Sequence, residues 1–281
     1  MFLIFVFIII FIAKFYERKQ NNLAQKTSEV FEGMKLVSYK SFLATLFCSA
    51  IFTVVFLIPL GQLLIWSYAE NNFFSIENIY LIFNSLILGA IVSMVTIFFG
   101  IALALAYRNE KKLRLIISVS SSGYAVPGSV ISAGLLVSIG YFFGVSITSF
   151  GIIGLVLCLS LRFMTPAYNY LSASLVNIKD SSEKALSTYS KDPMRAFKYF
   201  YLPHMKSATY LGLMIVFIES VKEQPATLLL RPVGFDTLST KIYNFTSEGQ
   251  WVMASNPSLM LVFLSLIFVY MINKNINKNK S

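Results

Sequence analysis

Charged residues are scarce in this chain of 281 residues, since Asp, Glu, Lys and Arg together make up 13% of it. A soluble domain of this size carries about 25%. The shortage argues against a soluble globular protein, and 56% of the residues are hydrophobic. In a soluble chain, a formal net charge of +10 would point to nucleic acid. Here the cations are sorted between loops instead, so we expect no nucleic-acid partner.

Residues that form disulfides, metal sites and nucleotide sites are also few. Cys48 and Cys158 both fall in apolar runs, which indicates lipid or core packing and gives no disulfide framework. The single histidine, His204, follows Pro203, and we interpret it as an interface residue rather than a ligand. None of the 14 glycines precedes a lysine, so a P-loop is missing. We therefore expect no catalytic residue, metal site, bound cofactor or ATP hydrolysis in this chain.

Long apolar runs are what the sequence has instead. A helix needs about 20 apolar residues to cross a bilayer, and continuous runs differ from the alternating pattern of barrel strands. Seven runs stand out, at about 1–16, 42–68, 80–107, 114–143, 146–168, 208–224 and 257–273. They predict an all-α membrane protein, a polytopic bundle of about seven transmembrane helices. The first run lacks the basic leader and cleavage site of a signal peptide, so we expect a membrane helix there.

Cations gather in alternate loops. The rich segments hold Lys14, Arg18, Lys19, Lys26, Lys35 and Lys40; Arg108, Lys111, Lys112 and Arg114; Lys179, Lys184, Lys191, Arg195, Lys198 and Lys206; and Lys274, Lys278 and Lys280. The alternate loops hold only Arg231 and Lys241. Cationic loops stay in the cytoplasm, which predicts an outer N-terminus and a cytoplasmic C-terminus.

The long loop at about 170–207 is cytoplasmic by this rule. Asp180 with Glu183 forms a capping-box pattern, and Asp192-Pro193 is a second helix start that we expect to end at Leu202-Pro203. An apolar set with a charged rim indicates a partner site. The apolar set is Leu186, Tyr189, Met194, Phe197, Phe200 and Tyr201. Packing on the chain's own helices, or lying at the lipid interface, is the alternative.

Two groups inside predicted spans draw attention. Glu219, Lys222 and Glu223 share a helical face by spacing, and with Gln224 they either line a translocation path near its outer end or only fix local packing. Pro127-Gly128 falls in the middle of the fourth run, where it predicts a gating hinge or a fixed kink.

The cytoplasmic loop resembles the EAA loop of binding-protein-dependent ABC importer permeases, which docks on the ATP-binding subunit as a coupling helix. Lys184-Ala185-Leu186 stands where that family has an acidic residue and two alanines, and Ser190 stands where it has glycine. The resemblance places ATPase coupling, within about 180–203, on Glu183, Ala185, Leu186, Tyr189, Ser190, Pro193, Arg195, Ala196, Phe197, Leu202 and Pro203.

Other segments extend the resemblance over about residues 41–273. They are Asn84-Ser85-Leu86, Ala102 to Tyr107, Tyr124 to Gly128, Ala133 to Leu135, Lys222 to Pro232 and Gly234 to Leu238. The stretch Lys222-Glu223-Gln224-Pro225-Ala226-Thr227 closely resembles the iron(III) branch of the family. This implies a type I ABC importer permease (MetI-like) fold at 41–273, preceded by an extra helix and cytoplasmic linker at 1–40 and followed by a cytoplasmic tail at 274–281.

The resemblance also implies partners in a bacterial inner membrane. They are an ABC ATPase dimer that binds ATP and Mg, a second permease half or a second copy of this chain, an extracytoplasmic solute-binding protein and membrane lipid. The chain resembles the C-terminal half of fused two-half permeases, with 1–16 like the last helix of a preceding half, so a split or truncated gene is one interpretation. Another cargo (thiamine, sulfate or a polyamine), a secondary transporter, and a membrane scaffold or insertion factor stay open as alternatives.

Overall fold

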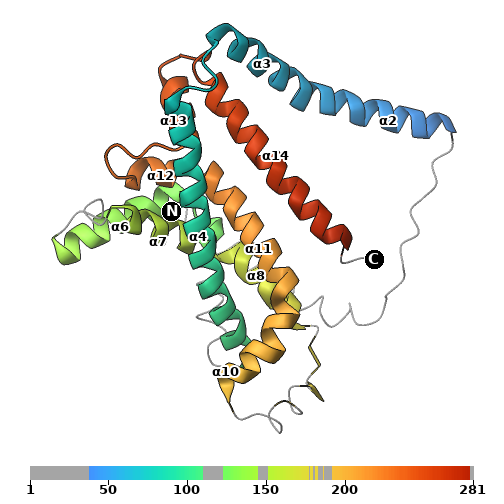
Figure 1. Cartoon of the computed structure of the whole chain (residues 1–281), viewed down its shortest axis with the longest axis vertical. Coiled ribbons are helices and arrows are strands. Elements are labelled where there is room, and N and C mark those ends of the chain that lie inside the picture. The colour runs from blue at the N-terminus through green and yellow to red at the C-terminus, as the bar shows by residue number, and fades with distance from the viewer. Residues whose placement is uncertain are drawn as a thin grey trace. The chain divides into compact units, whose positions relative to one another are not determined.

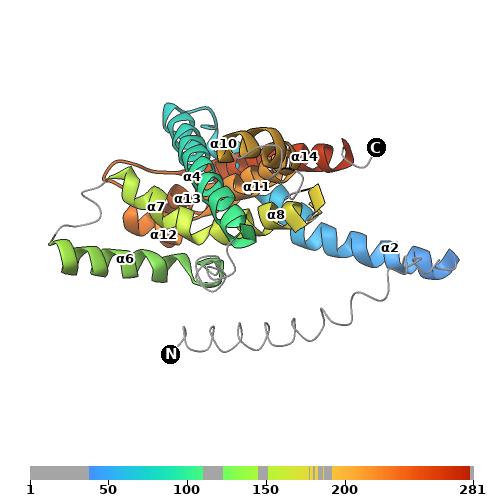
Figure 2. The ribbon, with the colours of Figure 1, turned by 90° about the horizontal axis from the view of Figure 1, so that it is seen from below.

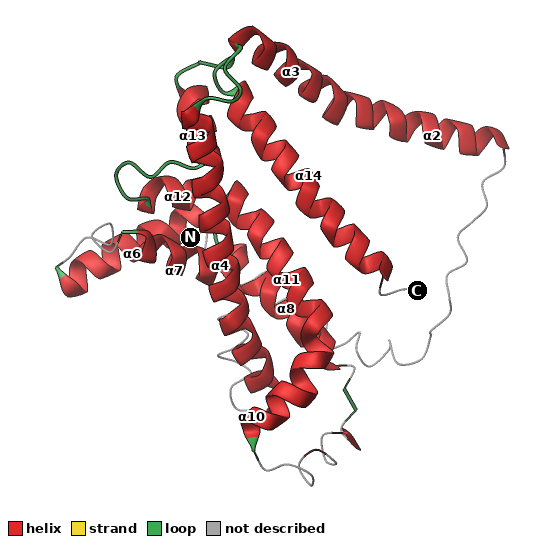
Figure 3. Cartoon of the chain, viewed as in Figure 1, coloured by secondary structure: helices red, strands yellow, loops and turns green. Residues whose placement is uncertain are grey.

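The computed structural model describes residues 38–109, 123–144, 151–176, 178–179, 181–182, 186 and 192–278. Within these ranges every regular element is a helix and no residue lies in a strand (Figure 3). The predicted all-α class is confirmed. The first predicted span, 1–16, and the opening of the fourth fall outside the described residues.

The chain divides between Gln62 and Leu63 into two compact units. The described part of the first unit is α2 (Ser38–Phe52), a π-helical turn (Thr53–Leu57) and the beginning of α3 (Ile58–Glu70). The segment Tyr39–Glu70 is long and apolar enough to span a membrane, and its most apolar window is entirely unburied. Cys48 lies exposed on this helix, which agrees with a helix whose sides contact lipid.

The second unit is built around three mutually packed helices, α4 (Ile76–Asn109), α8 (Met164–Val176) and α11 (Leu202–Lys222), visible in Figures 1 and 2. Gly212 of α11 lies so close to α4 that a Cβ there would stand 2.9 Å from Ile97 Cδ1. Small residues allow such close helix approach in membranes. Their shared core includes Val92, Ile97, Ala167, Leu171, Met205 and Val216.

Three further helices pack together at one side of α4. They are α6 (Gly128–Phe143), α7 (Ile152–Arg162) and α12 (Pro225–Leu230), and α7 also contacts α4 (Figure 1). The helices α13 (Leu238–Ser247) and α14 (Ser255–Lys278) complete the unit, with α14 packed against α11 and α4. This arrangement brings the two groups of interest from the sequence, near 127 and near 223, to the same part of the fold.

Three described helices are long and apolar enough to span a membrane, Tyr39–Glu70, Ile76–Arg108 and Ser255–Ile276. They contain the predicted runs 42–68, 80–107 and 257–273. The sixth predicted run, 208–224, falls mostly in α11, which begins earlier, at Leu202. Because α11 is packed between α4 and α8, fewer of its residues need to be lipid-compatible.

The fifth predicted run, 146–168, is not one straight helix. Its described part, from residue 151, forms α7 and the beginning of α8, and the two helices bend by 50° at Phe163. Pro166 stands in the first turn of α8 and explains the bend. A proline has no N–H to donate a hydrogen bond to the carbonyl of the residue four positions earlier, and its ring clashes with that carbonyl. The residue four earlier is Arg162, the last residue of α7.

The predicted end of a cytoplasmic helix at Leu202-Pro203 is wrong. The helix begins at Pro193 as α10 (Pro193–Ala196), continues through a π-helical turn (Phe197–Tyr201) and runs into α11 without a break. The Leu202 N–H bonds to the Phe197 carbonyl, five residues back. This wider turn lets the helix accommodate Pro203. A second π-helical turn, Thr53–Leu57, lies in the same way just before Pro59.

The predicted outer loop at 225–256 is partly helical. Pro225 opens α12, and Thr237 caps α13 through a capping box with Thr240. Proline is favoured in the first turn of a helix, as in α12, and a hydroxyl residue is favoured as the N-cap, as in α13. The loop is therefore a packed structure rather than an open connection.

Candidate functional site

Three helix breaks meet at one place in the second unit. They are the α7–α8 bend at Phe163, the α11–α12 break at Glu223-Gln224, and the gap at Val126-Pro127 between a 3-10 turn (Gly123–Ala125) and α6. The Tyr124 N–H donates to Thr165 Oγ1 at 3.2 Å, which links the first and third breaks. In membranes, broken helices are tolerated where protein buries them or where they line a cavity, and transporters place binding sites at such breaks.

An ion pair between Arg162 and Glu223 joins two of these breaks. Only 19% of the Arg162 side chain and 7% of the Glu223 side chain are exposed. Glu223 also accepts a hydrogen bond from the Ala226 N–H at 3.4 Å, at the start of α12. Arg162 Nε has no hydrogen-bond partner among the described residues. A buried pair of this kind fixes the relative positions of α7 and α12.

The backbone of Glu223 is held as firmly as its side chain. Its carbonyl accepts from Thr227 Oγ1 at 2.8 Å and from Ser239 Oγ, on α13, at 3.1 Å. The residue therefore contacts α7, α12 and α13 at once. Thr227 and Ser239 are themselves buried, so these bonds form away from open solvent.

Gly128 completes the contact between the three breaks. It is buried at the start of α6, and a Cβ at this position would overlap Arg162 Nη1 and Glu223 Oε1. Only glycine lets the chain pass this close to the ion pair. Pro127 is the N-cap of α6, with φ −56° and ψ 139°, rather than a residue inside a helix. Pro127-Gly128 thus stands at a helix start beside the ion pair, and the predicted role in gating or as a fixed kink stays a prediction.

Glu219 and Lys222 lie on the more open side of the same region. Lys222 Nζ and Glu219 Oε1 are 2.9 Å apart, and their side chains are 45% and 30% exposed. The Tyr124 hydroxyl donates to Glu219 Oε2 at 3.4 Å. The predicted common face of Glu219, Lys222 and Glu223 is not observed. Because α11 ends at Lys222, Glu223 is extended and turns inward to Arg162.

A second polar cluster ties the segment after α12 to α4. Asn84 Nδ2 donates to the Asp236 carbonyl at 2.8 Å, and the Leu238 N–H donates to Ser85 Oγ at 2.9 Å. Arg231 pairs with Asp236, and Lys241 Nζ lies 2.5 Å from Glu77 Oε1. Partial burial lowers the pKa of the Arg231 guanidinium, which stays charged at neutral pH. These contacts hold residues 231–241 against the beginning of α4.

The coupling residues predicted from the sequence are only partly within the described residues. Glu183, Ala185, Tyr189 and Ser190 lie outside them. Leu186 is half-buried in a helical conformation, Phe197 is half-buried, and Arg195 is 76% exposed beside Asp192 at 3.4 Å. The predicted helix start at Asp192-Pro193 is confirmed, since the Asp192 side chain accepts from the Met194 N–H at 3.0 Å. Pro193, Ala196, Leu202 and Pro203 belong to the same continuous helix.

The sequence predicts that His204 is an interface residue rather than a metal ligand. His204 is exposed and its Nδ1 donates to the Phe200 carbonyl at 2.7 Å. Across the described ranges, no group of three or more His, Cys, Asp or Glu side chains could hold a metal ion. Cys158 is buried in α7, in agreement with core packing.

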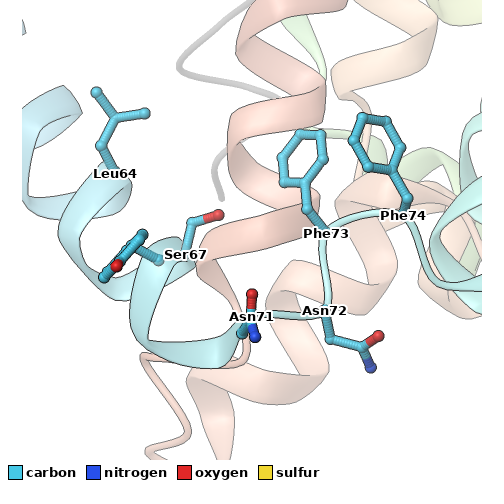
Figure 4. Close-up of a pocket in the computed structure, with 7 residues that line it drawn as sticks. Leu64, Ser67, Asn71, Asn72, Phe73 and Phe74 are labelled. Carbon is cyan, nitrogen blue, oxygen red and sulfur yellow. The ribbon is translucent and has the colours of Figure 1, made fainter.

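A surface depression of about 570 Å³ lies at the turn between α3 and α4. Figure 4 shows Leu64 on one side of it and Phe73 and Phe74 on the other, with Asn71 and Asn72 at the turn. Ser67 Oγ, which also lines it, donates to Asn256 Oδ1 of α14 at 2.5 Å. The depression contains none of the predicted site residues, and its lining carries no charged side chain.

Arg162 is the site residue that the sequence reading missed. It is a single cation in an otherwise apolar run, and an ionisable residue inside a span is usually paired or functional. Pro166, four residues later, marks the break beside it. These two signals together predict a polar break within the fifth run.

Comparison with curated proteins finds ferric-transport permeases. The chain is 29% identical over 239 residues to "Fe(3+)-transport system permease protein FbpB 2" of Haemophilus influenzae, covering 81% of this chain and 46% of the relative. It is 25% identical over 268 residues to "Ferric transport system permease protein FbpB" of Actinobacillus pleuropneumoniae, covering 85% and 39%. The chain thus spans less than half the length of these relatives.

Solved structures with the same fold are ABC transporters. A chain of a bacterial alginate ABC transporter in complex with an alginate-bound periplasmic protein superposes with a TM-score of 0.65 at 16% identity, covering 83% of this chain and 92% of that one. A chain of the inward-facing MetNI methionine transporter gives 0.53 at 16% identity, covering 73% and 98%. These likenesses confirm the predicted permease fold.

Residues 96–278 match the family described as "Binding-protein-dependent transport system inner membrane component". The match covers α8, α11 and the three helix breaks that meet at Arg162 and Glu223. This chain therefore belongs to the family of binding-protein-dependent transport system inner membrane components.

Proposed function

We propose that the chain is the transmembrane permease subunit of an ATP-driven importer for iron(III). The observation that carries the cargo assignment is that curated relatives over 81% and 85% of this chain are both ferric-transport permeases. The fold does not choose the cargo, because chains with the same fold serve alginate and methionine transporters. Thiamine, sulfate or a polyamine is the alternative cargo.

The proposed translocation path runs beside Glu219 and Lys222, whose side chains are more exposed than those of Arg162 and Glu223. The Arg162–Glu223 pair is buried, so it holds the wall of the path rather than contacting cargo. Gln224 is half-buried and is the N-cap residue of α12, directly after Glu223. A second permease half, or a second copy of this chain, closes the path on the open side.

The proposed energy source is a partner ATPase dimer that binds ATP and Mg. It docks on the loop at about 180–203, which the charge pattern assigns to the cytoplasm. A solute-binding protein delivers cargo to the opposite face, which includes residues 225–256. In this orientation the N-terminus is outside and the C-terminus is cytoplasmic. ATP binding and hydrolysis in the partner move the loop, and the spans open the path first to one side and then to the other.

A cargo assay in proteoliposomes tests this function. The chain is reconstituted with its second half, ATPase and solute-binding protein, and uptake of radiolabelled iron(III), thiamine, sulfate and spermidine is compared with and without ATP. We expect ATP-dependent uptake of iron(III) alone. Uptake of a different solute would reject the cargo, and uptake that follows an ion gradient without ATP would reject the importer.

Two variants test the path in the same assay. Glu219→Gln and Lys222→Gln should each lower iron(III) uptake while the ATPase still co-purifies, because both residues lie at the other end of α11 from the docking loop. Wild-type uptake in both variants would show that the exposed pair does not face cargo.

A further inference from the structure

Arg108, in the last turn of α4, holds the end of α8. One guanidinium nitrogen, Nη1, donates to the Leu175 carbonyl, and Nη2 donates to the Ile178 carbonyl at 2.8 Å. The last carbonyls of a helix lack partners within the helix. A cation placed there satisfies them and opposes the helix dipole. Arg108 thus binds the last turn of α8 at Leu175, whose carbonyl also accepts from the Ile178 N–H, and it binds the chain two residues beyond the helix end at Ile178.

The residues around Arg108 are packed as well as hydrogen-bonded. Leu175 and Ile178 are 2% and 6% exposed and belong to the main core, together with Ala104 of α4 and Met205 of α11. The ring of Tyr107, next to Arg108, meets the ring of Tyr168 on α8 edge-on, with centroids 6.0 Å apart. Two adjacent side chains of α4 therefore hold α8, Arg108 at its last turn and Tyr107 nearer its middle, at Tyr168.

The end of α8 is also where the predicted coupling loop begins. The loop returns at Asp192, whose side chain caps α10, and the helix then runs on into α11. Since α11 packs against both α4 and α8, the two ends of the loop are held by the same group of three helices. A movement of the coupling loop must therefore be transmitted to the membrane spans through these two ends of the loop.

We propose that Arg108 is a positioning residue for ATPase coupling, which fixes the start of the coupling loop to α4 so that movement of the loop is passed to the spans. This inference rests on the proposed function. The charge pattern alone places Arg108 among the cytoplasmic cations. Its side chain, however, is half-buried, and both of its terminal nitrogens donate to backbone carbonyls. Lys274, at the end of α14, is exposed and serves as the matched control.

The test uses the reconstituted importer with Arg108→Gln, Arg108→Lys and Lys274→Gln. For Arg108→Gln we expect the ATPase to stay bound and to hydrolyse ATP, while iron(III) taken up per ATP falls about fivefold or more, the lower end of typical coupling between sites. Arg108→Lys should not restore the ratio, because an ammonium cannot replace a planar fork on two carbonyls. Lys274→Gln should match wild type.

Hydrogen exchange supplies a readout apart from transport. In Arg108→Gln, exchange should rise in Ser172–Val176 and stay unchanged in α13 and α14. A wild-type transport ratio in Arg108→Gln overturns the proposal, and so does loss of protection throughout α13 and α14, because Arg108 would then stabilise the whole fold. If the wild type itself neither binds an ATPase nor transports, the proposed function fails, and this inference fails with it.

Discussion

Arg162 and Glu223 form an ion pair between the end of α7 and the residue that separates α11 from α12, and the start of α6 at Gly128 lies against it. The two residues are 61 positions apart in the sequence. Both stand at helix breaks, where backbone groups lose their regular partners. The ion pair thus adds a polar contact at the place where α6, α7 and α12 pack together, and two predictions depend on it.

Loss of one member of this pair should strongly destabilise the protein. Glu223→Gln leaves Arg162 buried without its counter-charge, which costs about 3–5 kcal/mol. Replacing both residues by Met should recover most of the loss, since a buried pair is often no better than packed apolar side chains. Thermal unfolding of the detergent-purified chain measures both. Glu219→Gln, which breaks a more exposed pair, is the control and should cost at most about 1 kcal/mol.

Gly128→Ala should disturb the ion pair without removing a charge. Its Cβ would overlap both Arg162 and Glu223, and such overpacking costs about 1–3 kcal/mol. Gly134→Ala, in the same helix, has nothing within 4 Å of the new Cβ and should stabilise by up to about 1 kcal/mol. Equal unfolding temperatures for the two variants would show that α6 does not pack on the pair.

Ser85→Ala should loosen the segment that follows α12. Ser85 Oγ accepts from the Leu238 N–H and donates to the Leu81 carbonyl, and all three residues are buried. Its removal leaves a buried N–H unpaired, at about 1–3 kcal/mol. Ser93→Ala loses only a bond to Ala90 in its own helix and is the matched control. Hydrogen exchange at Leu238 should accelerate in Ser85→Ala alone. Similar exchange rates in both variants would show that the hydrogen bond from Leu238 to Ser85 does not hold this segment.

Local signals in the sequence predicted the parts of this fold that depend on local chemistry. Continuous apolar runs predicted the helices at 42–68, 80–107 and 257–273, and Asp192-Pro193 predicted the beginning of α10. Hydropathy, however, records how apolar a run is and not its direction, so the bend at Phe163 was missed although Pro166 marks it. Pro203 predicts a helix end, because a single sequence does not reveal the π-helical turn that accommodates it.

The candidate site was predicted in pieces. The sequence indicates Glu223 and Gly128 separately, each within its own run, but nothing in one sequence shows that they meet at Arg162. Their meeting depends on tertiary packing of α6, α7 and α12, which brings residues far apart in the chain together. Glu223 was placed on the face of Glu219 because the helix was expected to continue, whereas α11 ends one residue before it.

The most direct test of the account is co-purification of an ABC ATPase with the membrane-extracted chain, together with its second permease half. The variants are Leu186→Asp with Tyr189→Asp in the coupling loop, and Val233→Asp, a fully exposed apolar position outside it, as the control. The account predicts that the ATPase accompanies wild type and Val233→Asp and is lost from the loop variant. Absence of an ATPase from the wild type, or its full retention by the loop variant, would contradict the assignment of this chain as an importer permease coupled through residues 180–203.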